Sequence, residues 1–594
     1  MPILWSEFPI VRRVFFFTRN PFFALRILRL SISELKYLLN FAHFMSSFLG
    51  SLHFILLTDL HLSDNPDTAT YHALQWAVEF INQKMPDFLA VGGDITTFGT
   101  AASTIRFLEA IDQVKVPVFF TPGNAELRSP EALLYLKDLC SPERRYTLQG
   151  DLLVLFPDTS TGALPLAERE WLSRILAEHS LIDRRIVITH YPLDTLETES
   201  REWFSEWLTQ QRVELLAAGH IHRHRRRYVN GCLEITTRGL DPDKAIGDLP
   251  GISLLESSKP GEWSEQFYPW PSTVQLLPAD LPDGIAPVGW SIHGDPVDAA
   301  RETFDFGLSC VELRPRDLDF SRHALADALQ RLRDGGPLFL SYHLPSLTWN
   351  PASNRIEGED TLRSHLDCAL DSGVNSLTIH VPQAPAFDME RIEGDVILPT
   401  ALYREFEAVY ARLFRDPARE GIRIAIENIH NAPGTPVNAP HRKFATKIDE
   451  YLRWIDAVTR IMNDIPDAMV GSLFDIGHAR NNGGDLDNMQ PLCDWYARLG
   501  RRILGYHIHQ VDTHPETGRL SNHREVVSFF SRRISYAGFL WAWSTHQITR
   551  APLFIEVRDD EARRNTALRF KQLFENAHHI TEAVDLPDRP TIGK

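Results

Sequence analysis

The feature that most constrains the fold is an alternation of short apolar runs with longer amphipathic stretches, which occurs twice along the chain. Alternation of this kind predicts an α/β layered fold. The first series fills residues 51 to 256, and its apolar runs are His53–Thr58, Phe88–Val91, Val116–Phe120, Leu152–Phe156, Arg185–Thr189 and Glu214–Ala218. A chain of 594 residues exceeds what one core usually holds, so at least two large domains are expected.

The second series has a different rhythm and begins near residue 285. Stretches with helical spacing, such as His365–Asp371 and Tyr403–Phe414, separate its apolar segments. Those segments are Val288–Ile292, Cys310–Leu313, Leu338–Tyr342, Ser376–Ile379, Ile422–Ile426, Val470–Phe474, Ile503–Tyr506 and Leu553–Ile555. Eight strand–helix units over this length predict one (β/α)₈ barrel at 285–580. The proline-rich stretch 257–284 is predicted to be a linker, and 581–594 a tail.

Residues 1–50 are predicted to be an N-terminal extension without a stable fold of its own. They hold six Lys or Arg residues against two acidic residues, and Tyr37–Thr58 contains no charged side chain. One interpretation is a membrane-surface or targeting segment. We favour a plain upstream extension, because His53–Thr58 is needed as the first strand of the first domain. No firm membrane association is therefore expected.

The charge and the cysteines restrict the class of protein further. A net charge of -17 and a pI near 5.8 disfavour, without excluding, a general nucleic-acid binder. The five cysteines are scattered and form no CxxC pair, which argues against a zinc knuckle or a disulfide framework. That usage is typical of a cytoplasmic protein. The oligomeric state is left open.

Metal-type ligands follow the apolar runs of the first series. The pieces, in chain order, are Asp59-Leu60-His61, Gly93-Asp94, Gly123-Asn124, His190 and Gly219-His220-Ile221-His222. Their positions place carboxylate, amide and imidazole groups on one edge of a sheet. Two divalent ions need several such donors and one bridging carboxylate, for which Asp94 is central in the order. Any one piece alone is more often a turn or a core residue, but five in order favour a metal site.

These motifs resemble the DxH, GD, GNH, H and GHxH pattern of the calcineurin-like metallophosphoesterases, over about residues 51–256. The resemblance implies a four-layer β-sandwich flanked by helices and two divalent ions, Mn²⁺, Fe²⁺ or Zn²⁺. It implies that Asp59, His61, Asp94 and His222 hold the first ion. Asp94, Asn124, His190 and His220 would hold the second. Asp94, Asn124 and His190 would be the catalytic residues.

The chain departs from that family pattern at one position. It reads Gly123-Asn124-Ala125-Glu126, whereas the family usually has histidine at the position of Ala125. That histidine contacts the phosphate and helps to protonate the leaving group, and such help contributes roughly 10²–10⁴-fold to the rate. Glu126 and His224 are candidates to replace it. The basic run Arg223 and Arg225–Arg227 is interpreted equally well as an anion-binding patch or as a solvated strand.

Metal-type ligands also follow the strands predicted for the barrel, at the ends where barrel active sites lie. They are His343, His380, Glu427, Asp475, His478, His507, His523 and Glu556. The pieces IEN, FDIGH, YHIHQ and FIEVR resemble the xylose-isomerase-like barrels, which include sugar isomerases, epimerases and the endonuclease IV family. One or more Mn²⁺, Zn²⁺ or Mg²⁺ ions are implied.

The two branches of that superfamily imply different sites. An epimerase would use Glu427, Asp475, His507 and Glu556 for one ion, with Glu427 and Glu556 also moving protons. An endonuclease IV-like enzyme would use all eight ligands. The aspartate that this branch expects two residues before His523 is Ser521 here.

Three functions follow from these patterns. The first is a phosphoesterase for a small mono- or diester, with a sugar phosphate as one candidate, fused to an isomerase- or epimerase-like barrel. The second is an endonuclease IV-like enzyme that processes nucleic acids or nucleotides. The third is a catalytically impaired metal-binding regulatory protein, for which Ala125 and Ser521 are the support.

Overall fold

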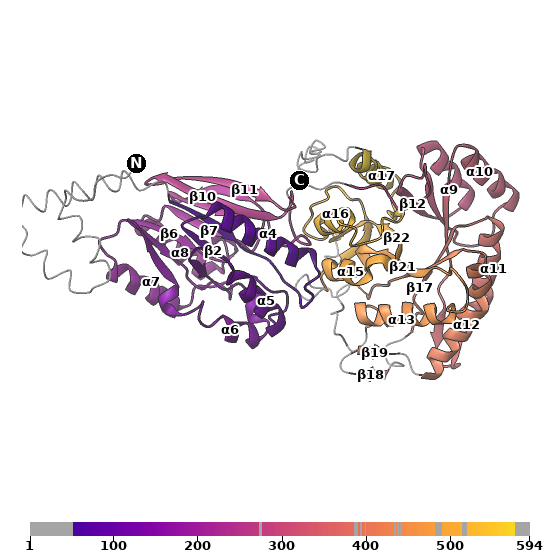
Figure 1. The fold of residues 1–594 in the computed structure, drawn as a ribbon, viewed down its shortest axis with the longest axis horizontal. Helices are drawn as coiled ribbons and strands as arrows, with labels where there is room; N and C mark the ends of the chain where they lie inside the picture. Colours follow the sequence, from indigo (N-terminus) through magenta and orange to yellow (C-terminus); the bar gives the residue numbers. More distant parts are fainter. Residues whose placement is uncertain are drawn as a thin grey trace, which may run out of the picture.

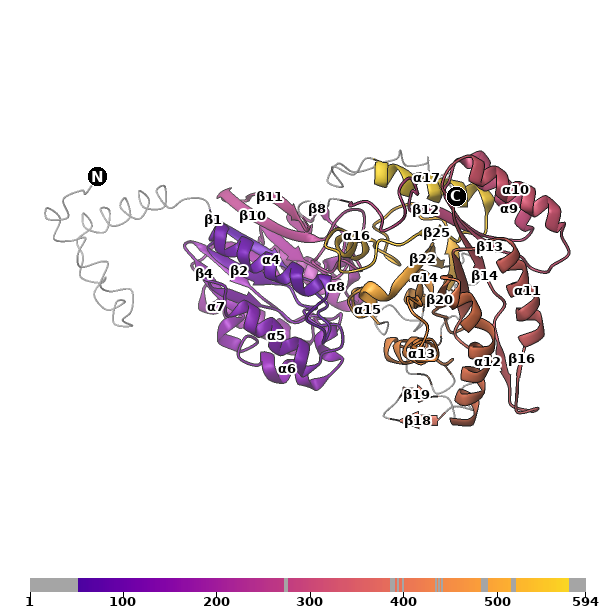
Figure 2. The same cartoon turned by 45° about the vertical axis from the view of Figure 1, so that its right-hand side comes forward.

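The computed structural model of the chain describes the two predicted domains side by side (Figures 1 and 2). The described residues are 52–271, 276–384, 390–392, 395–397, 400–432, 435, 439, 442–481, 490–513 and 520–575. The predicted extension 1–50 and tail 581–594 lie outside them. Within the described part, no helix is both long and apolar enough to span a bilayer.

Two sheets form the centre of the first domain. The first sheet has the order β11-β10-β1-β2-β3, and the second has the order β4-β5-β6-β7-β9-β8. The strands of the first sheet are β1 (Leu52–Leu57), β2 (Phe88–Val91), β3 (Val118–Phe120), β10 (Gly251–Lys259) and β11 (Glu262–Pro269). Those of the second are β4 (Tyr146–Gln149), β5 (Leu152–Leu155), β6 (Arg184–Ile188), β7 (Leu215–Ala218), β8 (Arg225–Val229) and β9 (Cys232–Thr236).

Strand alternation sends the apolar side chains of these sheets to two cores. Phe54 and Leu56 of β1 pack in the core between the sheets, whereas Ile55 and Leu57 belong to the core under the outer helices. The helices over the first sheet are α4 (Ala69–Lys84), α5 (Ala101–Ile111) and α6 (Pro130–Leu136). Helices α7 (Leu166–Glu178) and α8 (Thr198–Gln210) cover the second sheet. The predicted four-layer sandwich is therefore confirmed.

The first domain extends further along the chain than we predicted. Strands β10 and β11 pair antiparallel from Gly251 to Pro269, so the first sheet continues past residue 256. The prolines that suggested a linker from 257 lie where they do not interrupt this pairing: Pro260 is in the hairpin turn and Pro269 ends β11. The connection between the domains is correspondingly shorter than 257–284.

The second domain is a closed barrel of eight parallel strands, in chain order around the ring. The strands are β12 (Val288–His293), β13 (Cys310–Arg314), β14 (Phe339–His343), β17 (Ser376–His380), β20 (Arg423–Glu427), β21 (Val470–Asp475), β22 (Ile503–Ile508) and β25 (Leu553–Ile555). Each one overlaps a predicted segment, so the predicted (β/α)₈ barrel is confirmed. Apolar side chains fill one end of its interior, namely Cys310, Phe339, Ala425, Leu473 and Phe554.

Helices surround the barrel and pack on its strands through one continuous apolar core. They are α9 (Pro296–Phe306), α10 (Arg322–Asp334), α11 (Glu359–Asp371), α12 (Thr400–Arg419), α13 (Ile448–Ile461), α14 (Ile476–Asn481), α15 (Leu492–Leu499), α16 (Ala537–Ser544) and α17 (Asp560–Glu575). Three hairpins extend the connections: β15 (Thr348–Asn350) with β16 (Arg355–Glu357), β18 (Glu390–Ile392) with β19 (Asp395–Ile397), and β23 (Gln510–Thr513) with β24 (Leu520–Arg524). Helices α15 and α16 lie at the boundary with the first domain, beside α4 (Figures 1 and 2).

Candidate metal centres

The first candidate centre lies where five strands of the first domain end. The predicted ligands follow β1, β2, β3, β6 and β7 and converge from both sheets. They form two groups whose ligand atoms lie within 4.8 Å of one another: Asp59, His61 and His222, and Asp94, His190 and His220. The second group also includes Asn124, whose Oδ1 is 3.2 Å from His190 Nε2. The structure thus brings together all seven predicted ligands of this domain.

Asp94 connects the two groups, because one of its carboxylate oxygens faces each group. Its Oδ2 is 3.5 Å from His61 Nε2, and its Oδ1 is 3.4 Å from His190 Nε2. Between His61 and His222 the two Nε2 atoms are 3.2 Å apart. Such close nitrogens suit a shared cation, because two imidazole lone pairs can both point at one ion. Asp94 therefore has the position expected of a bridging carboxylate.

The backbone at this centre is locally strained. Asp59, His61, Asp94, His220 and His222 all have φ between 49 and 68°, in the left-handed region that residues other than glycine rarely adopt. Such conformations persist where the surroundings enforce them, and they cluster at functional sites. The fit is tight as well. A Cβ at Gly123 would lie 2.3 Å from Asp94 Oδ1, and one at Gly219 would lie 2.4 Å from Asp59 Oδ2.

Burial and neighbouring charges set the protonation of these ligands. Burial, with the nearby ammonium of Lys244, lowers the pKa of His61 and His222 well below 6.5, so both imidazoles are neutral. Burial would raise the pKa of Asp94, but His190 and His61 hold it well below 3.8. Burial would also lower the pKa of His190, yet Asp94 and Asp59 raise it to about 9. The anionic Asp94 and the neutral His61 and His222 suit a divalent cation, whereas His190 has to release its proton to bind one.

The segment after Asn124 holds Asp94 in place. The backbone N–H of Ala125 donates to Asp94 Oδ1 at 2.7 Å. Glu126 accepts the backbone N–H groups of Gly123, Asp94 and Ile95 at 2.7, 2.9 and 2.9 Å. Its carboxylate is therefore used to shape the loop. The other candidate replacement for the missing histidine, His224, lies 2.7 Å from Glu265.

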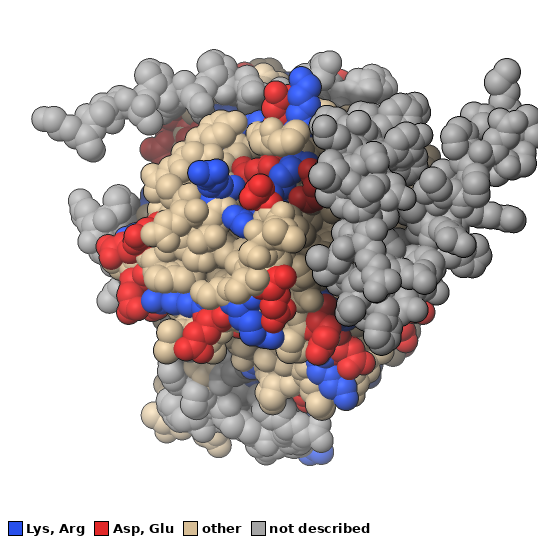
Figure 3. Space-filling view, turned by 90° about the vertical axis from the view of Figure 1, so that its left-hand side faces the viewer, with Lys and Arg blue, Asp and Glu red and all other residues tan. Residues whose placement is uncertain are grey.

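The basic run after the GHIH motif lies largely on β8, at the edge of the second sheet. Arg225 and Arg227 both form ion pairs with Asp194 and Glu234. The pairing favours the interpretation of a solvated edge strand over that of an anion-binding patch. On the end of the molecule drawn in Figure 3, coloured Lys/Arg and Asp/Glu side chains alternate around a broad uncharged area.

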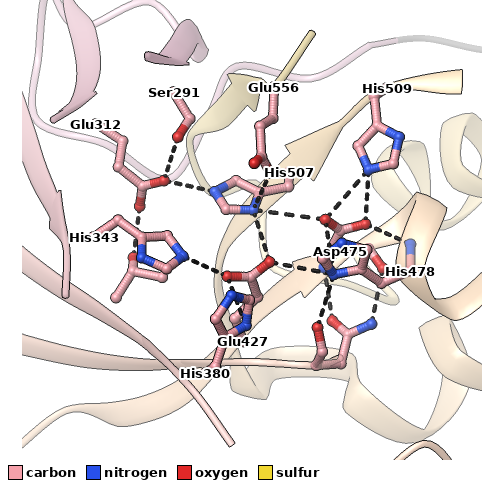
Figure 4. Close-up of polar contacts among 12 residues, drawn as sticks. Ser291, Glu312, His343, His380, Glu427, Asp475, His478, His507, His509 and Glu556 are labelled. Carbon is pink, nitrogen blue, oxygen red and sulfur yellow. Dashed lines mark hydrogen bonds and ion pairs between the residues drawn. The ribbon is translucent and has the colours of Figure 1, made fainter. Parts of the chain in front are cut away.

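The second candidate centre lies inside the barrel, at the carboxyl ends of its strands (Figure 4). Three groups of ligand atoms form there, each with its atoms within 4.8 Å of one another. Their members are His343, His380 and Glu427; Glu427, Asp475, His507 and Glu556; and Asp475, His478, His509 and His523. All eight predicted ligands belong to one of these groups, together with His509.

Two carboxylates are shared between neighbouring groups. Glu427 Oε2 lies 2.6 Å from His343 Nε2, while its Oε1 lies 3.2 Å from His507 Nδ1. Asp475 Oδ1 is 3.0 Å from His509 Nε2 in the third group, and its Oδ2 is 3.7 Å from His507 Nδ1 in the second. The three groups therefore form one continuous array, joined in the way that bridging carboxylates join a multinuclear centre.

Glu312 supports this array from within the barrel and was missed in the sequence. Its Oε2 is 2.6 Å from His507 Nε2, and Ser291, Ser341 and Thr378 donate hydroxyl hydrogen bonds to it. Burial would raise its pKa, but His507 lowers it to about 2. A charged Glu312 orients His507 so that Nδ1 faces Glu427 and Glu556. Its position could have been predicted, because Glu312 is a charged residue within an apolar strand at a position that faces the barrel interior.

His509 is the second residue that sequence reasoning missed. It lies two residues after His507, and strand alternation gives residues at this spacing the same face. Its Nε2 is 3.0 Å and 3.3 Å from the two oxygens of Asp475. Ser521, at the position of the expected aspartate, has no carboxylate to offer an ion. His509 thus supplies the third group with a donor that Ser521 does not.

The polar atoms of His523 also fit an ion at this end of the array. Both ring nitrogens are buried and make no hydrogen bond among the described residues, although Nε2 lies 3.5 Å from Glu556 Oε1. Burial lowers the pKa of His523 to about 3, so the imidazole is neutral. A buried, neutral imidazole that makes no hydrogen bond is costly unless it binds a ligand. The donor sets of both domains therefore fit divalent ions.

The fold and the ligand sets define a hydrolase domain of the metallophosphoesterase type joined to a barrel that contains candidate metal-binding groups. Residues 52–224 match the family described as calcineurin-like phosphoesterase, and residues 298–575 match the xylose isomerase-like TIM barrel family. Residues 52–224 therefore form a calcineurin-like phosphoesterase domain, and residues 298–575 form a xylose isomerase-like TIM barrel. The phosphoesterase family typically binds two divalent metal ions.

Several known proteins are similar to parts of the chain. A probable cyclic nucleotide phosphodiesterase from Synechococcus is 26% identical over 247 residues, covering 37% of this chain and 92% of the relative. The 3',5'-cyclic adenosine monophosphate phosphodiesterase CpdA of Escherichia coli K12 is 27% identical over 188 residues, covering 28% and 68%. The solved xylose isomerase domain protein from Planctomyces limnophilus is 15% identical, with 49% and 96% covered and a TM-score of 0.32.

Proposed function

We propose that the first domain hydrolyses a phosphodiester of a small molecule, with cyclic nucleotides as the first class to test. The observation that carries this proposal is the pair of ligand groups joined by Asp94, whose two oxygens face His61 and His190. The names of the curated relatives support a diester, because both describe cyclic nucleotide phosphodiesterases. The net charge of -17 supports a small substrate over a polyanion.

Two ions of Mn²⁺, Fe²⁺ or Zn²⁺ would be held by the seven predicted ligands, with Asp94 common to both. When bound, such a pair of ions stabilises charge on the phosphoryl oxygens and lowers the pKa of water. The chain orients the ligands for this. His190 Nδ1 donates to the carbonyl of Gly92 at 2.8 Å, which leaves Nε2 facing Asp94. The N–H of Ala125 fixes the other side of Asp94.

The absence of an imidazole at Ala125 limits the choice of substrate. Among the described side chains, Glu126 and His224 are engaged elsewhere, so neither replaces it as a proton donor to the leaving group. We therefore expect rates to depend strongly on the acidity of the leaving group. An aryl diester should react about 10²–10⁴-fold faster than an alkyl diester of equal size, the range that general acid help normally contributes.

Metal-reconstituted full-length protein tests the proposal directly. Bis-p-nitrophenyl phosphate, cyclic AMP, cyclic GMP and p-nitrophenyl phosphate would be assayed with Mn²⁺, Fe²⁺ and Zn²⁺ in turn. We expect diester hydrolysis that requires metal and is lost in Asp94→Asn. Protein that carries two ions in this domain but cleaves none of these diesters would refute the proposal.

For the barrel we propose a multinuclear centre that processes a phosphoester, rather than a one-ion isomerase. The observation that favours it is that Glu427 and Asp475 are each shared between two ligand groups. A one-ion epimerase would need the four-ligand group alone and would leave His478, His509 and His523 without a role. Metal analysis distinguishes these functions, since the multinuclear centre predicts more than one barrel ion per chain and the epimerase predicts one.

A substrate panel completes this comparison. Sugar phosphates would be tested for isomerisation and abasic duplex DNA for nicking, each against Glu427→Gln. Turnover of a sugar phosphate without bond cleavage at phosphorus would favour the epimerase.

The five cysteines are all unpaired, which supports a cytoplasmic location for either activity.

A further inference from the structure

The barrel contacts the first domain through the N-terminal turn of α15 and through α16. Trp541 of α16 packs against His72 of α4 and against Trp270, with ring centroids 4.9 and 5.7 Å apart. Gln547 donates to the backbone carbonyl of Asp67 at the start of α4. Figures 1 and 2 both show α15 and α16 beside the first domain. These contacts alone would describe an ordinary domain interface.

Two polar contacts of α15 differ, because one reaches a loop that carries metal ligands and the other reaches a segment that supports them. Ser63, two residues after His61, donates from Oγ to Asp494 Oδ1 at 2.6 Å. Asp243 accepts the backbone N–H of Cys493 at 2.9 Å and its thiol at 3.1 Å. The N–H groups in the first turn of a helix have no partner within that helix, so Asp243 caps α15 from the other domain.

Asp243 lies in the segment 237–250, between β9 and β10, and this segment supports the remaining ligands of the first group. The N–H groups of Leu240 and Asp241 donate to the backbone carbonyl of Asp59 at 3.2 and 2.9 Å. The N–H of Ile246 donates to the carbonyl of His222 at 3.0 Å. Every ligand of that group, which consists of Asp59, His61 and His222, is therefore near a contact that leads to the barrel.

The fit around these contacts is close and dry. Asp243 and Cys493 are 2% and 1% exposed, and Ser63 is 7% exposed. A Cβ at Gly538 would lie 2.8 Å from Cys493 Sγ and 3.1 Å from Asp243 Oδ1, so no larger residue fits there. Burial raises the pKa of Asp243, and the positive charge of Arg480 on α14 opposes that rise. The interface therefore holds these groups in one arrangement.

We propose that the barrel braces the first metal centre, with Ser63, Asp243 and Asp494 as positioning residues for the loops of Asp59, His61 and His222. The inference rests on the proposed function insofar as it takes the first group to be a metal site. All three ligands have left-handed backbone, with φ of 51, 49 and 51°. Strained conformations relax when the surroundings stop enforcing them. Removing these interdomain contacts should therefore lower the affinity for the ion that these three residues hold.

Full-length Ser63→Ala, Asp243→Ala and Asp243→Asn variants test the brace, with Gln547→Ala as the matched control. The control removes a contact of the same interface at the far end of the His61 loop, where Gln547 donates to the carbonyl of Asp67 beside α4, six residues after His61. Mn²⁺ affinity would be measured by equilibrium dialysis with metal analysis, without substrate, alongside kcat and KM for the diester as a function of Mn²⁺. Supporting groups around metal ligands typically change affinity about 10–100-fold.

We expect Ser63→Ala and Asp243→Ala to bind the ion held by Asp59, His61 and His222 about 10–100-fold less tightly. Saturating Mn²⁺ should restore kcat at unchanged KM, barrel metal content should stay the same, and Asp243→Asn should be milder because it keeps an acceptor for Cys493. Wild-type Mn²⁺ affinity in both alanine variants, or an equal loss in Gln547→Ala, would overturn the brace. If Asp243→Ala does not fold, Ser63→Ala decides. If the wild-type protein binds Mn²⁺ tightly but cleaves no diester, the proposed function is refuted and the interdomain proposal is not.

Discussion

The two centres reach similar ligand sets by different physical routes. In the first domain the ligands lie on loops after strands, and five of them have left-handed backbone. In the barrel the ligands lie on or just after strands, and among those described only His523 has positive φ. The first centre therefore depends on local turn geometry and on the contacts that enforce it. The second depends on closure of a rigid ring of strands.

This difference predicts how each centre responds to change. Strained loops need external support, and the first centre obtains it from Glu126 within its own domain and from α15 of the barrel. The barrel centre instead has support beneath it, where Glu312 binds His507 and three hydroxyl groups. Single changes should therefore affect one centre without the other, except at the interface.

The largest expected effect comes from replacing the two bridging carboxylates, each of which should affect only its own centre. Asp94→Asn removes a charged donor from both ions of the first centre, so we expect diester hydrolysis to fall at least about 10³-fold. Glu427→Gln should empty the barrel groups that share it and leave diester hydrolysis within about twofold, because separated sites act independently. Kinetics and metal analysis of both variants check this. Loss of diesterase activity in Glu427→Gln would mean that the hydrolytic site is in the barrel.

The sequence predicted which side chains converge in the first centre, because short local motifs encode its turns. Asp59, His61 and Gly93-Asp94 are adjacent or nearly adjacent residues, so short motifs identify them. The barrel required non-local information. Glu312 acts on His507 across the ring, at a sequence separation of 195 residues, and no local motif encodes that pairing. The brace by α15 also joins distant segments, such as Ser63 and Asp494, and could not be predicted from either alone.

The next effect compares two glycines that each lie against a metal ligand. Gly123→Ala would place a Cβ 2.3 Å from Asp94 Oδ1, and Gly477→Ala would place one 1.9 Å from Cε1 of His509. We expect Gly123→Ala to lower the affinity for both ions of the first centre by about 100-fold, because the clash displaces the bridging carboxylate of Asp94. Gly477→Ala should weaken only the barrel ion that His509 helps to hold. Equilibrium dialysis separates these outcomes, and loss of every barrel ion in Gly477→Ala would argue against a separate third site.

A smaller effect is expected from the support under His507. Glu312→Gln removes the negative charge beside His507 Nε2, so His507 becomes a poorer ligand and its group should lose about tenfold in affinity. Ser291→Ala is the matched control, since it removes only a hydroxyl donor to the same carboxylate. Metal titration of both variants, followed by Co²⁺ absorption, measures the difference. Equal affinities in the two variants would show that Glu312 does not tune the site.

The smallest expected effect is an opposite pH dependence of the two domains after metal removal. Burial raises the pKa of Glu126 from 4.5 to about 7, so the folded first domain binds that proton more tightly than the unfolded chain. Its stability should therefore fall as pH rises from 4.5 to 7, by up to about 1.4 kcal/mol per pH unit for one proton. In the barrel, the pKa of Glu312 is lowered to about 2, so its contribution is present above pH 4.5 and is lost as pH falls towards 2.

Thermal unfolding in the presence of a chelator, at pH values from 4.5 to 7, separates the two contributions. Glu126→Gln cannot titrate, so it should flatten the slope of the first transition whatever its effect on the midpoint. Glu312→Gln should leave that slope unchanged, because the Glu312 carboxylate stays ionised across this range in the folded barrel. A slope that survives in Glu126→Gln would assign the proton to Asp59 or Asp241, whose pKa values burial also raises, to about 7 and about 8. Mn²⁺ at saturation should abolish the slope if the group is Asp59, the predicted metal ligand, and leave it if the group is Asp241.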